Sequence, residues 1–381
     1  MSATVLIAVT HLLGSGHLVR AANLARALSR DGFAVTLASG GMRLRSMEQE
    51  PFTFVQLPPV RTEGVDFRTL LDEAGQPIDP EHKAQRVALL EGLAASLRPG
   101  AVIVEHFPFG RRQLAGEFLA LIVAARAANP KSLILSSIRD VLVRPRPECI
   151  AEAEDRLATL FDAVLVHGDA DFLPLDRSWP VDARLAAKLR YTGYMAEAPA
   201  SGEPIESGEV LVSGGGSGAA IPLFELAIAA AKLGPQDLRW RILVGRAVGE
   251  GVFGRLQAEA PAHATVERVR PDFPALLAGC AISISQAGYN TVLDLVAARR
   301  PAIVVPFDAG GETEQAIRAE AMERAGLARC LRISGEGALT PGGLAAAVAA
   351  GIGRRPPGIA LALDGARNAA AIVKQLLAER V

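Results

Sequence analysis

A short apolar run, a glycine-containing turn and a helical pattern follow one another repeatedly in this sequence, and this order constrains the fold more than any other feature. The clearest example is residues 282–315, which read ISISQAGYNTVLDLVAARRPAIVVPFDAGGETEQ. Residues 280–285 and 302–306 are apolar runs of strand length, and residues 290–298 place apolar side chains at helical spacing. Two consecutive strands would then end at one edge of a parallel sheet, where open α/β sheets bind ligands.

The same alternation occupies both halves of the chain. Residues 4–10 are an apolar run followed by the turn HLLGSGH and a helical pattern. The segment EAPASGEPIESG, residues 197–208, has no apolar periodicity and is typical of a linker. We therefore expect an α/β protein with two Rossmann-like parallel-sheet domains facing each other across a cleft. The expected boundaries are 1–195 and 209–357 for the domains, 196–208 for the linker, and 358–381 for a last helix that packs back toward the first domain.

Composition excludes several classes of protein. The 381 residues suffice for two hydrophobic cores, and 40 Lys and Arg nearly balance 41 Asp and Glu, so no net positive charge is available to hold a nucleic acid. Cys149, Cys280 and Cys330 are odd in number and far apart, which argues against a disulfide framework or a zinc knuckle. The first apolar run is too short for a signal peptide, and no charge-free run reaches about 18 residues. We expect a cytoplasmic protein.

The turn SGGGSGA, residues 213–219, follows an apolar strand and opens a helix. Its backbone N–H groups could cradle a phosphate at the helix N-terminus. A dinucleotide site would add an acidic residue about 20 positions on, but the next strand ends in Val244, Gly245 and Arg246. The pattern favours a mononucleotide over NAD, and a glycine turn needed only for strand-to-helix packing is the alternative.

The turn QAGYNTVLD, residues 286–294, is more specific. Gly288 would let the backbone approach a ligand, Asn290 and Thr291 could donate hydrogen bonds, and Asp294 could accept them from vicinal ribose hydroxyls. A capped helix with a solvated Asp is the alternative. At the neighbouring strand end, Glu314 and Gln315 suit a polyol such as a sugar, although they are also ordinary first-turn residues of a helix.

These motifs resemble those of GT-B glycosyltransferases of family 28, the MurG-like type, and of a subgroup of predicted bacterial glycosyltransferases. The matching pieces are LVSGGGSGA, QAGYNTVLD, RRPAIVVPF and ETEQAIRAEAM in the second half and GSGHLVRAANLARAL in the first. The resemblance implies a GT-B fold, with an acceptor-binding first domain and a second domain that binds a nucleotide-sugar donor.

The resemblance also assigns roles to residues. It places Asp294 on the ribose of a UDP-sugar, Glu314 and Gln315 on the hexose hydroxyls, and the backbone near Arg268 and Val269 against the uracil. The remaining donor-binding assignments are Gly14, Gly16, Ser213, Gly214, Gly215, Gly216, Gln286, Gly288, Asn290 and Thr291. Two departures bear on the nucleotide. The family usually has Glu where Asp294 stands, and Gly193-Tyr194-Met195 replaces a hinge segment that normally supplies an arginine.

His17 follows the glycines of the first turn and would face the donor phosphates. A neutral imidazole near pH 7 can bind phosphate or act as a base, and a packed or capping histidine is the alternative. GSGHxxR, with Arg20, also resembles the nucleotide-sugar hydrolases of pseudaminic acid synthesis, where this histidine is important for hydrolysis. A hydrolase that uses water as acceptor therefore stays open.

The segment EHFPFGRR, residues 105–112, lies at a strand end of the acceptor domain. Glu105 or His106 could deprotonate an acceptor hydroxyl, and Arg111 and Arg112 could bind an anionic acceptor. A solvated loop is the alternative.

Three further predictions concern the acceptor site and the membrane. Asp140, at the next strand end, is another candidate for the base that takes the acceptor proton. The polar residues 66–81 are expected to form a long loop that faces the cleft. Phe107 and Phe109, beside the two arginines, could touch an anionic membrane surface, which would make the protein peripheral at the inner membrane face.

Asp169-Ala170-Asp171 spells the DxD motif of metal-dependent glycosyltransferases. We reject a metal site here, because that motif belongs to a different glycosyltransferase fold and helix N-termini can hold the phosphates. The sequence thus predicts a metal-independent, inverting glycosyltransferase without cofactor, which moves N-acetylglucosamine or a related hexose from a UDP-sugar to an acceptor hydroxyl. The acceptor is unidentified and could be a small molecule, a lipid-linked compound or a glycan. A noncatalytic nucleotide-sugar-binding protein is the remaining alternative.

Overall fold

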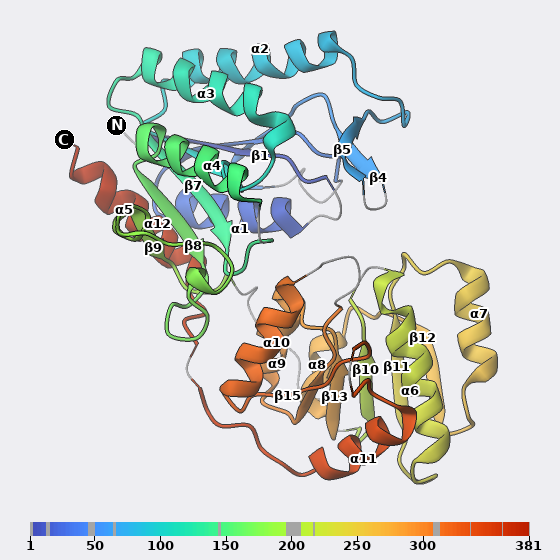
Figure 1. Ribbon diagram of the computed structural model, residues 1–381. Helices are drawn as coiled ribbons and strands as arrows, with labels where there is room; N and C mark the ends of the chain where they lie inside the picture. The colour runs from blue at the N-terminus through green and yellow to red at the C-terminus, as the bar shows by residue number, and fades with distance from the viewer. Residues whose placement is uncertain are drawn as a thin grey trace. The chain divides into compact units, whose positions relative to one another are not determined.

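The computed structural model divides into two compact units (Figure 1). The first comprises Met1–Met195 and Ala362–Val381, and the second Ala196–Leu361. The structure describes residues 3–12, 16–44, 50–63, 66–143, 146–195, 207–215, 218–307, 313–335, 337–359 and 361–380.

The first unit is built on a parallel sheet of seven strands. In spatial order the strands are β3 (Thr53–Gln56), β2 (Ala34–Ser39), β1 (Thr4–Val9), β6 (Ala101–Glu105), β7 (Leu133–Arg139), β8 (Ala163–His167) and β9 (Leu189–Tyr191). The chain adds β2 and β3 on one side of β1, then crosses and adds β6 to β9 on the other. The switch point of this sheet therefore lies between β1 and β6.

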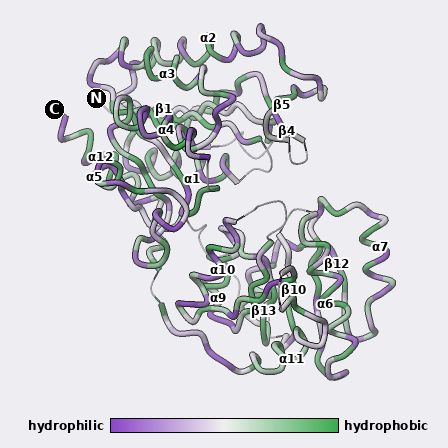
Figure 2. Tube along the Cα trace, in the orientation of Figure 1, coloured by the Kyte–Doolittle hydropathy of each residue, from purple (hydrophilic) through white to green (hydrophobic). Residues whose placement is uncertain are grey.

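Helices cover both faces of this sheet, so its central strands are apolar on both sides. Leu6 packs into a core shared with α2 (Pro80–Leu97), α3 (Ala115–Ala128) and α4 (Pro147–Leu160). Ile7 points to the opposite core, shared with α1 (Gly16–Arg30) and α12 (Gly365–Ala378). Helix α2 alternates between hydrophobic and hydrophilic residues along its length (Figure 2). The unit also contains α5 (Ala183–Lys188) and the 3-10 turns η2 (Arg112–Leu114) and η3 (Leu175–Arg177).

The last helix, α12, belongs to the first unit. Ala369, Ala370 and Val373 are fully buried in the core that they share with α1. The Asn368 side chain also donates to the carbonyl of Thr192 at 2.9 Å. The end of the chain therefore holds the segment that follows β9.

Part of the predicted long loop at residues 66–81 is strand. β5 (Asp66–Leu71) pairs antiparallel with β4 (Arg61–Glu63), and α2 begins at Pro80. The loop prediction was wrong for these residues because β5, which reads DFRTLL, has no continuous apolar run: Arg68 and Thr69 separate Phe67 from Leu70.

The second unit has a parallel sheet of six strands. In spatial order they are β12 (Ala264–Arg268), β11 (Trp240–Val244), β10 (Val210–Ser213), β13 (Ile282–Ser285), β14 (Ala302–Val304) and β15 (Arg329–Cys330). The helical elements are η4 (Gly218–Ala220), α6 (Ile221–Leu233), α7 (Glu250–Glu259), α8 (Phe273–Gly279), α9 (Tyr289–Ala298), α10 (Glu314–Arg324) and α11 (Pro341–Gly351). The switch point lies between β10 and β13.

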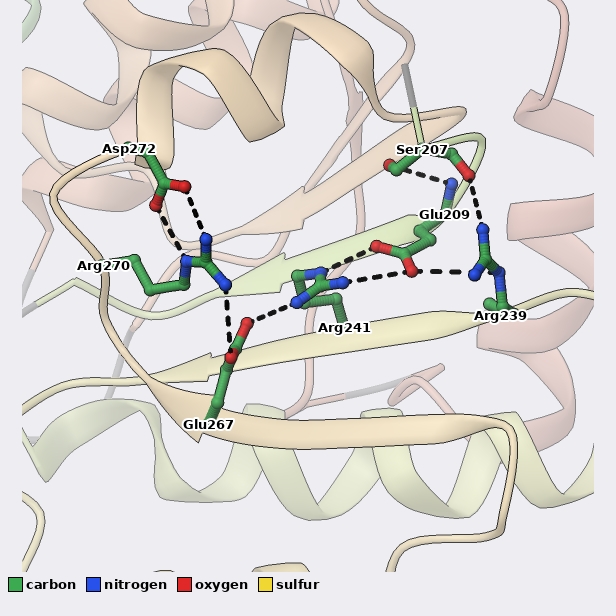
Figure 3. Close-up of polar contacts among 7 residues, drawn as sticks. All are labelled: Ser207, Glu209, Arg239, Arg241, Glu267, Arg270 and Asp272. Atoms are coloured by element: carbon green, nitrogen blue, oxygen red, sulfur yellow. Dashed lines mark hydrogen bonds and ion pairs between the residues drawn. The ribbon is translucent and has the colours of Figure 1, made fainter. Parts of the chain in front are cut away.

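A chain of charged side chains crosses one face of this second sheet at β11 and β12 (Figure 3). Arg241 pairs with Glu209 at 2.7 Å and with Glu267 at 2.6 Å, and Arg270 joins Glu267 to Asp272. Arg241 and Glu267 are 21% and 27% exposed, so solvent reaches this face of the sheet. Each pair is therefore expected to contribute little to stability.

The predicted α/β class with two parallel sheets is confirmed. Within the described part of the chain, no helix combines the length and the apolar character that crossing a membrane requires.

Candidate functional site

Polar and ionisable residues gather where the strands of the first sheet end. Glu105 and His167 are the last residues of β6 and β8, Ser137 lies near the end of β7, and His17 is in the first turn of α1. Because these strands are parallel neighbours, their carboxyl ends meet beside the switch point. We call these strand ends, with the start of α1, the first-unit edge.

Glu105 is the centre of the first-unit edge. It is 2% exposed, and its Oε1 lies 3.0 Å from Nδ1 of His17 and also accepts a hydrogen bond from Arg20. Its Oε2 accepts a hydrogen bond from the Ser137 hydroxyl. Burial raises the pKa of Glu105, but the Arg20 charge and the Ser137 hydrogen bond outweigh burial and hold the pKa below its ordinary value. The carboxylate is therefore ionised at neutral pH.

His17 is a neutral imidazole whose side chain is 14% exposed. Burial, followed by the charges of Arg20 and Arg111, lowers its pKa well below the ordinary value. Its Nδ1 lies 3.0 Å from both the Glu105 carboxylate and the Arg20 guanidinium. Two of the predicted catalytic residues are thus in direct contact. Gly16 precedes His17 in the first turn of α1, whereas Gly14 lies outside the described residues.

Behind Glu105, the polar contacts continue through residues that the sequence analysis did not identify. The Ser137 hydroxyl lies 2.9 Å from Nε2 of His167, and Nδ1 of His167 lies 2.9 Å from the Thr192 hydroxyl. Burial lowers the pKa of His167 to about 3, so this imidazole is neutral. The signal in the sequence was a serine and a histidine at the ends of otherwise apolar strands.

The segment after β6 contributes only part of what was predicted. His106 is adjacent to His17, with ring centroids 5.3 Å apart, and burial lowers its pKa well below the ordinary value. Arg111 donates to the carbonyl of Thr10 at 2.8 Å. Burial is also the main reason that the pKa of Arg111 falls to about 10. Arg112 is exposed at the start of η2. Arg111 therefore adds positive charge to the edge, and the acceptor role of all three residues stays a prediction.

The predicted membrane contact through Phe107 and Phe109 was wrong. Phe107 is fully buried against Phe118, and Phe109 packs edge-on against Trp179. Both rings belong to the hydrophobic core on one face of the sheet. The sequence did not reveal this, because an apolar residue in a short segment after a strand can point into the core as readily as toward solvent.

Asp140 lies beyond the end of β7 and is 1% exposed. One carboxylate oxygen accepts from the backbone N–H of Val141 at 2.9 Å, and the other accepts from the Tyr194 hydroxyl at 3.3 Å. The carboxylate of Asp169 accepts from the backbone N–H groups of Asp171 and Ala362. Both carboxylates therefore have a structural use in holding the chain.

At the second sheet, the turn after β10 is closely packed. Ser213 ends β10 and is buried. A Cβ on Gly214 would lie 2.0 Å from Cβ of Ala220, so this glycine is required by packing. Gly215 has φ +68°, which favours glycine. The packing alternative accounts for Gly214 and Gly215 without a ligand, and Gly216 lies outside the described residues.

The turn after β13 is tied to its neighbour by an amide. The Gln286 side chain donates to the carbonyl of Ala219 at 3.2 Å. Gly288 is the N-cap residue of α9, Asn290 is exposed and Thr291 is half-buried in its first turn. Asp294 is half-buried on the same helix.

The next turn is held by Gln315. Its Oε1 accepts from the backbone N–H of Ala287 at 3.2 Å and from that of Phe307 at 3.0 Å. Gln315 therefore joins the turns after β13 and β14, and its contact with a sugar stays a prediction. Glu314 is 4% exposed and lies 3.5 Å from Arg318. We call the strand ends of β10, β13 and β14, with the starts of α9 and α10, the second-unit edge.

Arg268 and Val269 shape the neighbouring loop after β11. The Arg268 guanidinium lies over the Phe253 ring at 4.0 Å and donates to the carbonyls of Gly245 and Val248. The backbone N–H of Val269 donates to the carbonyl of Val244 at 3.0 Å, and the Val269 side chain is exposed. A contact of this backbone with uracil stays a prediction.

Comparison with known families gives the second unit an identity. Residues 209–352 match the glycosyltransferase family 28 C-terminal domain. The second unit is a family 28 glycosyltransferase domain. The resemblance that the motifs indicated is confirmed, and the matched range contains all predicted donor residues of this unit.

Two curated relatives are UDP-N-acetylglucosamine--N-acetylmuramyl-(pentapeptide) pyrophosphoryl-undecaprenol N-acetylglucosamine transferases. The protein from Rhodospirillum centenum is 34% identical over 133 residues, which cover 34% of either chain. The protein from Paramagnetospirillum magneticum is 33% identical over 179 residues, which cover 45% of either chain. The chain thus spans less than half the length of these relatives.

Solved structures of glycosyltransferases share the fold over the whole chain. MurG of Acinetobacter baumannii gives a TM-score of 0.62 at 18% identity and covers 99% of either chain. The kitacinnamycin glycotransferase gives 0.64 at 18% identity and covers 99% of this chain and 100% of its own. The predicted GT-B fold is confirmed.

One departure from the family 28 pattern has a structural use. Tyr194, in the segment where the family supplies an arginine, is fully buried, and its hydroxyl donates to Asp140. Its backbone N–H donates to the carbonyl of Ala362. The segment is therefore built into the first unit.

Proposed function

We propose that this protein is a glycosyltransferase that moves N-acetylglucosamine or a related hexose from a UDP-sugar to an acceptor hydroxyl. The observation that carries the proposal is the contact of neutral His17 with ionised Glu105 at 3.0 Å, in a chain whose second unit is a family 28 glycosyltransferase domain. The curated relatives transfer N-acetylglucosamine by name.

Among the three candidate bases, the contacts favour His17. Asp140 and Glu105 already accept hydrogen bonds on both carboxylate oxygens. His17 has one ring nitrogen against Glu105, and none of the hydrogen bonds among the described residues engages its Nε2, which could therefore take the proton of the acceptor hydroxyl. Glu105 then stabilises the imidazolium that forms.

The bond changes follow from that assignment. The acceptor oxygen forms a bond to the anomeric carbon as the bond from this carbon to the UDP oxygen breaks, with inversion, and UDP leaves with the electron pair. Helix N-termini and turns of the second-unit edge stabilise the departing diphosphate, so the proposal needs no metal.

The charges at the first-unit edge favour an acceptor with an anionic group. Arg20, Arg111 and Arg139 each lower the pKa of His17, which places three positive charges around this imidazole. A phosphate or carboxylate on the acceptor could accept hydrogen bonds from guanidinium groups of this kind. The relatives act on a pyrophosphoryl compound by name, and we propose an acceptor of this chemical kind.

A nucleotide-sugar hydrolase is the second candidate, because the same pair of His17 and Glu105 would activate a water molecule. Incubation of UDP-N-acetylglucosamine without acceptor separates the two. A stable donor supports a transferase, and rapid release of free sugar that is lost in His17→Ala supports a hydrolase.

Donor binding is tested by calorimetry with UDP and UDP-N-acetylglucosamine on the wild type, Asp294→Ala and the control Asp272→Ala, which removes an exposed carboxylate of the same unit. We expect Asp294→Ala to weaken binding about 10- to 100-fold, since hydrogen bonds to charged groups contribute about 1.5–3 kcal/mol, and Asp272→Ala to bind as the wild type does. The donor assignment fails if the wild type binds neither compound or if the two variants bind equally. EDTA should leave turnover unchanged.

A further inference from the structure

The buried contacts behind Glu105 form one continuous chain of hydrogen-bonding groups. The chain runs from Thr192 through His167 and Ser137 to Glu105, and each step joins side chains at least 25 residues apart in sequence. Ser137, His167 and Thr192 are 2% exposed or less. None of them lies among the groups that the proposed reaction uses.

We infer that Ser137 and His167 are positioning residues that hold Glu105 against His17 and thereby keep the His17 proton on Nδ1, which leaves Nε2 as the acceptor. The tautomer itself is a property of the folded protein. Only the effect on the rate rests on the proposed function.

The ionised carboxylate fixes the direction of the hydrogen bonds. Glu105 can only accept, so the Ser137 hydroxyl has to donate its single proton to Oε2. The Ser137 oxygen then accepts from Nε2–H of His167. Because His167 is neutral, its Nδ1 carries a lone pair and accepts from the Thr192 hydroxyl.

The opposite direction leaves an unfavourable contact. The Thr192 hydroxyl also lies 2.8 Å from the carbonyl of Gly193, so it could donate there and accept from Nδ1–H of His167. Nε2 of His167 would then accept the Ser137 proton, and the Ser137 oxygen would face the Glu105 carboxylate with no proton between them. Two buried acceptors in contact are costly, so the first direction is favoured.

Both ends of the chain are anchored. The backbone N–H of Thr192 donates to the carbonyl of Val166 at 3.0 Å, and its carbonyl accepts from Asn368 of α12 at 2.9 Å. At the other end, Arg20 and Glu105 compete for Nδ1 of His17 at equal distances of 3.0 Å. A hydrogen bond to Glu105 requires a proton on Nδ1, whereas a hydrogen bond from Arg20 requires a lone pair there. If Glu105 is held in place, the Nδ1–H tautomer is favoured; if Glu105 moves away, Nδ1 is left to accept from Arg20.

Nitrogen NMR of the full chain labelled with ¹⁵N-histidine tests the inference, since protonated and unprotonated ring nitrogens differ in chemical shift. We expect His17 to carry its proton on Nδ1 in the wild type and in Ser137→Thr, which keeps the hydroxyl. Ser137→Ala and His167→Leu should show a mixture or the Nε2–H form. Ser136→Ala is the matched control, because Ser136 also loses a buried hydrogen bond, to the carbonyl of Phe107, without touching Glu105.

Turnover gives the second measurement. We expect kcat to fall about 10- to 100-fold in Ser137→Ala and His167→Leu, with unchanged UDP binding, and to stay near the wild-type value in Ser136→Ala and Ser137→Thr. An Nε2–H tautomer in the wild type, or an unchanged tautomer in both disrupting variants, overturns the inference. The wild-type spectrum decides even if a variant does not fold. If the spectra agree with the inference and no sugar is transferred or released, the proposed function fails while the positioning role stands.

Discussion

The two strand-end edges differ in what holds them together. At the first-unit edge, ionisable groups are buried in contact with one another, and Glu105 alone joins His17, Arg20 and Ser137. At the second-unit edge, the turns are joined by a neutral amide, as Gln315 accepts from two backbone N–H groups, and the buried Glu314 lies 3.5 Å from Arg318 within one helix, α10. Both edges end parallel sheets of the same kind, so the difference lies in the residues placed there and not in the topology.

This contrast separates two kinds of function. Buried charges in mutual contact shift pKa values and prepare groups for proton transfer. Turns fixed by amide and backbone hydrogen bonds keep N–H groups oriented for a ligand without a change of charge. Substitutions at the first-unit edge should therefore alter activity and pH dependence, and substitutions at the second-unit edge should alter stability and donor binding.

The largest effect is expected at His17. Replacement of the base by alanine should lower kcat about 10²- to 10⁴-fold and leave UDP affinity within a factor of two, since the change removes proton transfer and no donor contact. The measurements are turnover of UDP-N-acetylglucosamine and calorimetric binding of UDP. His82→Ala, on α2, is the control and should keep full activity. Turnover within threefold of the wild type would remove His17 from the proposed mechanism.

At the second-unit edge, Gln315→Ala should destabilise the protein. It leaves the backbone N–H groups of Ala287 and Phe307 without their acceptor, and each unpaired buried group costs about 1–3 kcal/mol. Gln315→Glu is the matched control, because a carboxylate oxygen can accept both bonds. Urea unfolding should show a loss of about 2 kcal/mol or more for Ala and a much smaller loss for Glu. Equal losses would mean that these bonds do not hold the turns.

The glycine turns of the two units should also respond differently. A Cβ on Gly214 meets Ala220 at 2.0 Å, so Gly214→Ala should cost about 1–3 kcal/mol through overpacking. A Cβ on Gly16 meets nothing within 4 Å, and Gly16→Ala should change stability by less than about 0.5 kcal/mol. Thermal unfolding of both variants measures the difference. A stable Gly214→Ala variant would show that the turn after β10 can move.

The elements of the fold that repeat could be predicted from the sequence. Apolar runs and glycine turns located the strands that end at Glu105 and Ser285, because burial on both faces leaves a continuous apolar signal. The strand at residues 66–71 was missed because Arg68 and Thr69 interrupt its apolar residues. The turn toward the core that buries Phe107 and Phe109 depends on packing partners such as Trp179, which are distant in sequence.

The candidate site was predictable only one residue at a time. His17 and Glu105 stood out because each follows a turn or ends a strand, yet they are 88 positions apart in sequence, and no local pattern predicts their contact. Ser137 and His167 looked like ordinary strand residues, and their importance comes from what they touch. Gln315 was predicted to contact a sugar, and the sequence alone does not show that its oxygen also accepts from two backbone N–H groups.

The smallest effect should appear in the acid dependence of stability. His167 has a pKa of about 3 in the folded protein against about 6.5 when unfolded, so the unfolded chain binds more protons between these values. Stability contributed by neutral His167 is therefore fully present above about pH 6.5 and is lost as the pH falls toward 3. Arg20 and Glu105 are the charged groups that act on this imidazole.

His167→Gln removes this proton uptake. We expect the free energy of unfolding of the variant to fall less steeply on acidification from pH 6 to pH 5, by about 1 kcal/mol per pH unit relative to the wild type. Urea unfolding across this window measures the slope, with His82→Gln as the control outside the edge. Asp294→Ala should keep the wild-type slope, since the second-unit edge holds its turns without buried histidines among its described residues. If the free energy of unfolding falls with the same slope in the wild type and in His167→Gln, His167 is not kept neutral in the folded protein. The distinction between the two edges would then rest on His17 alone.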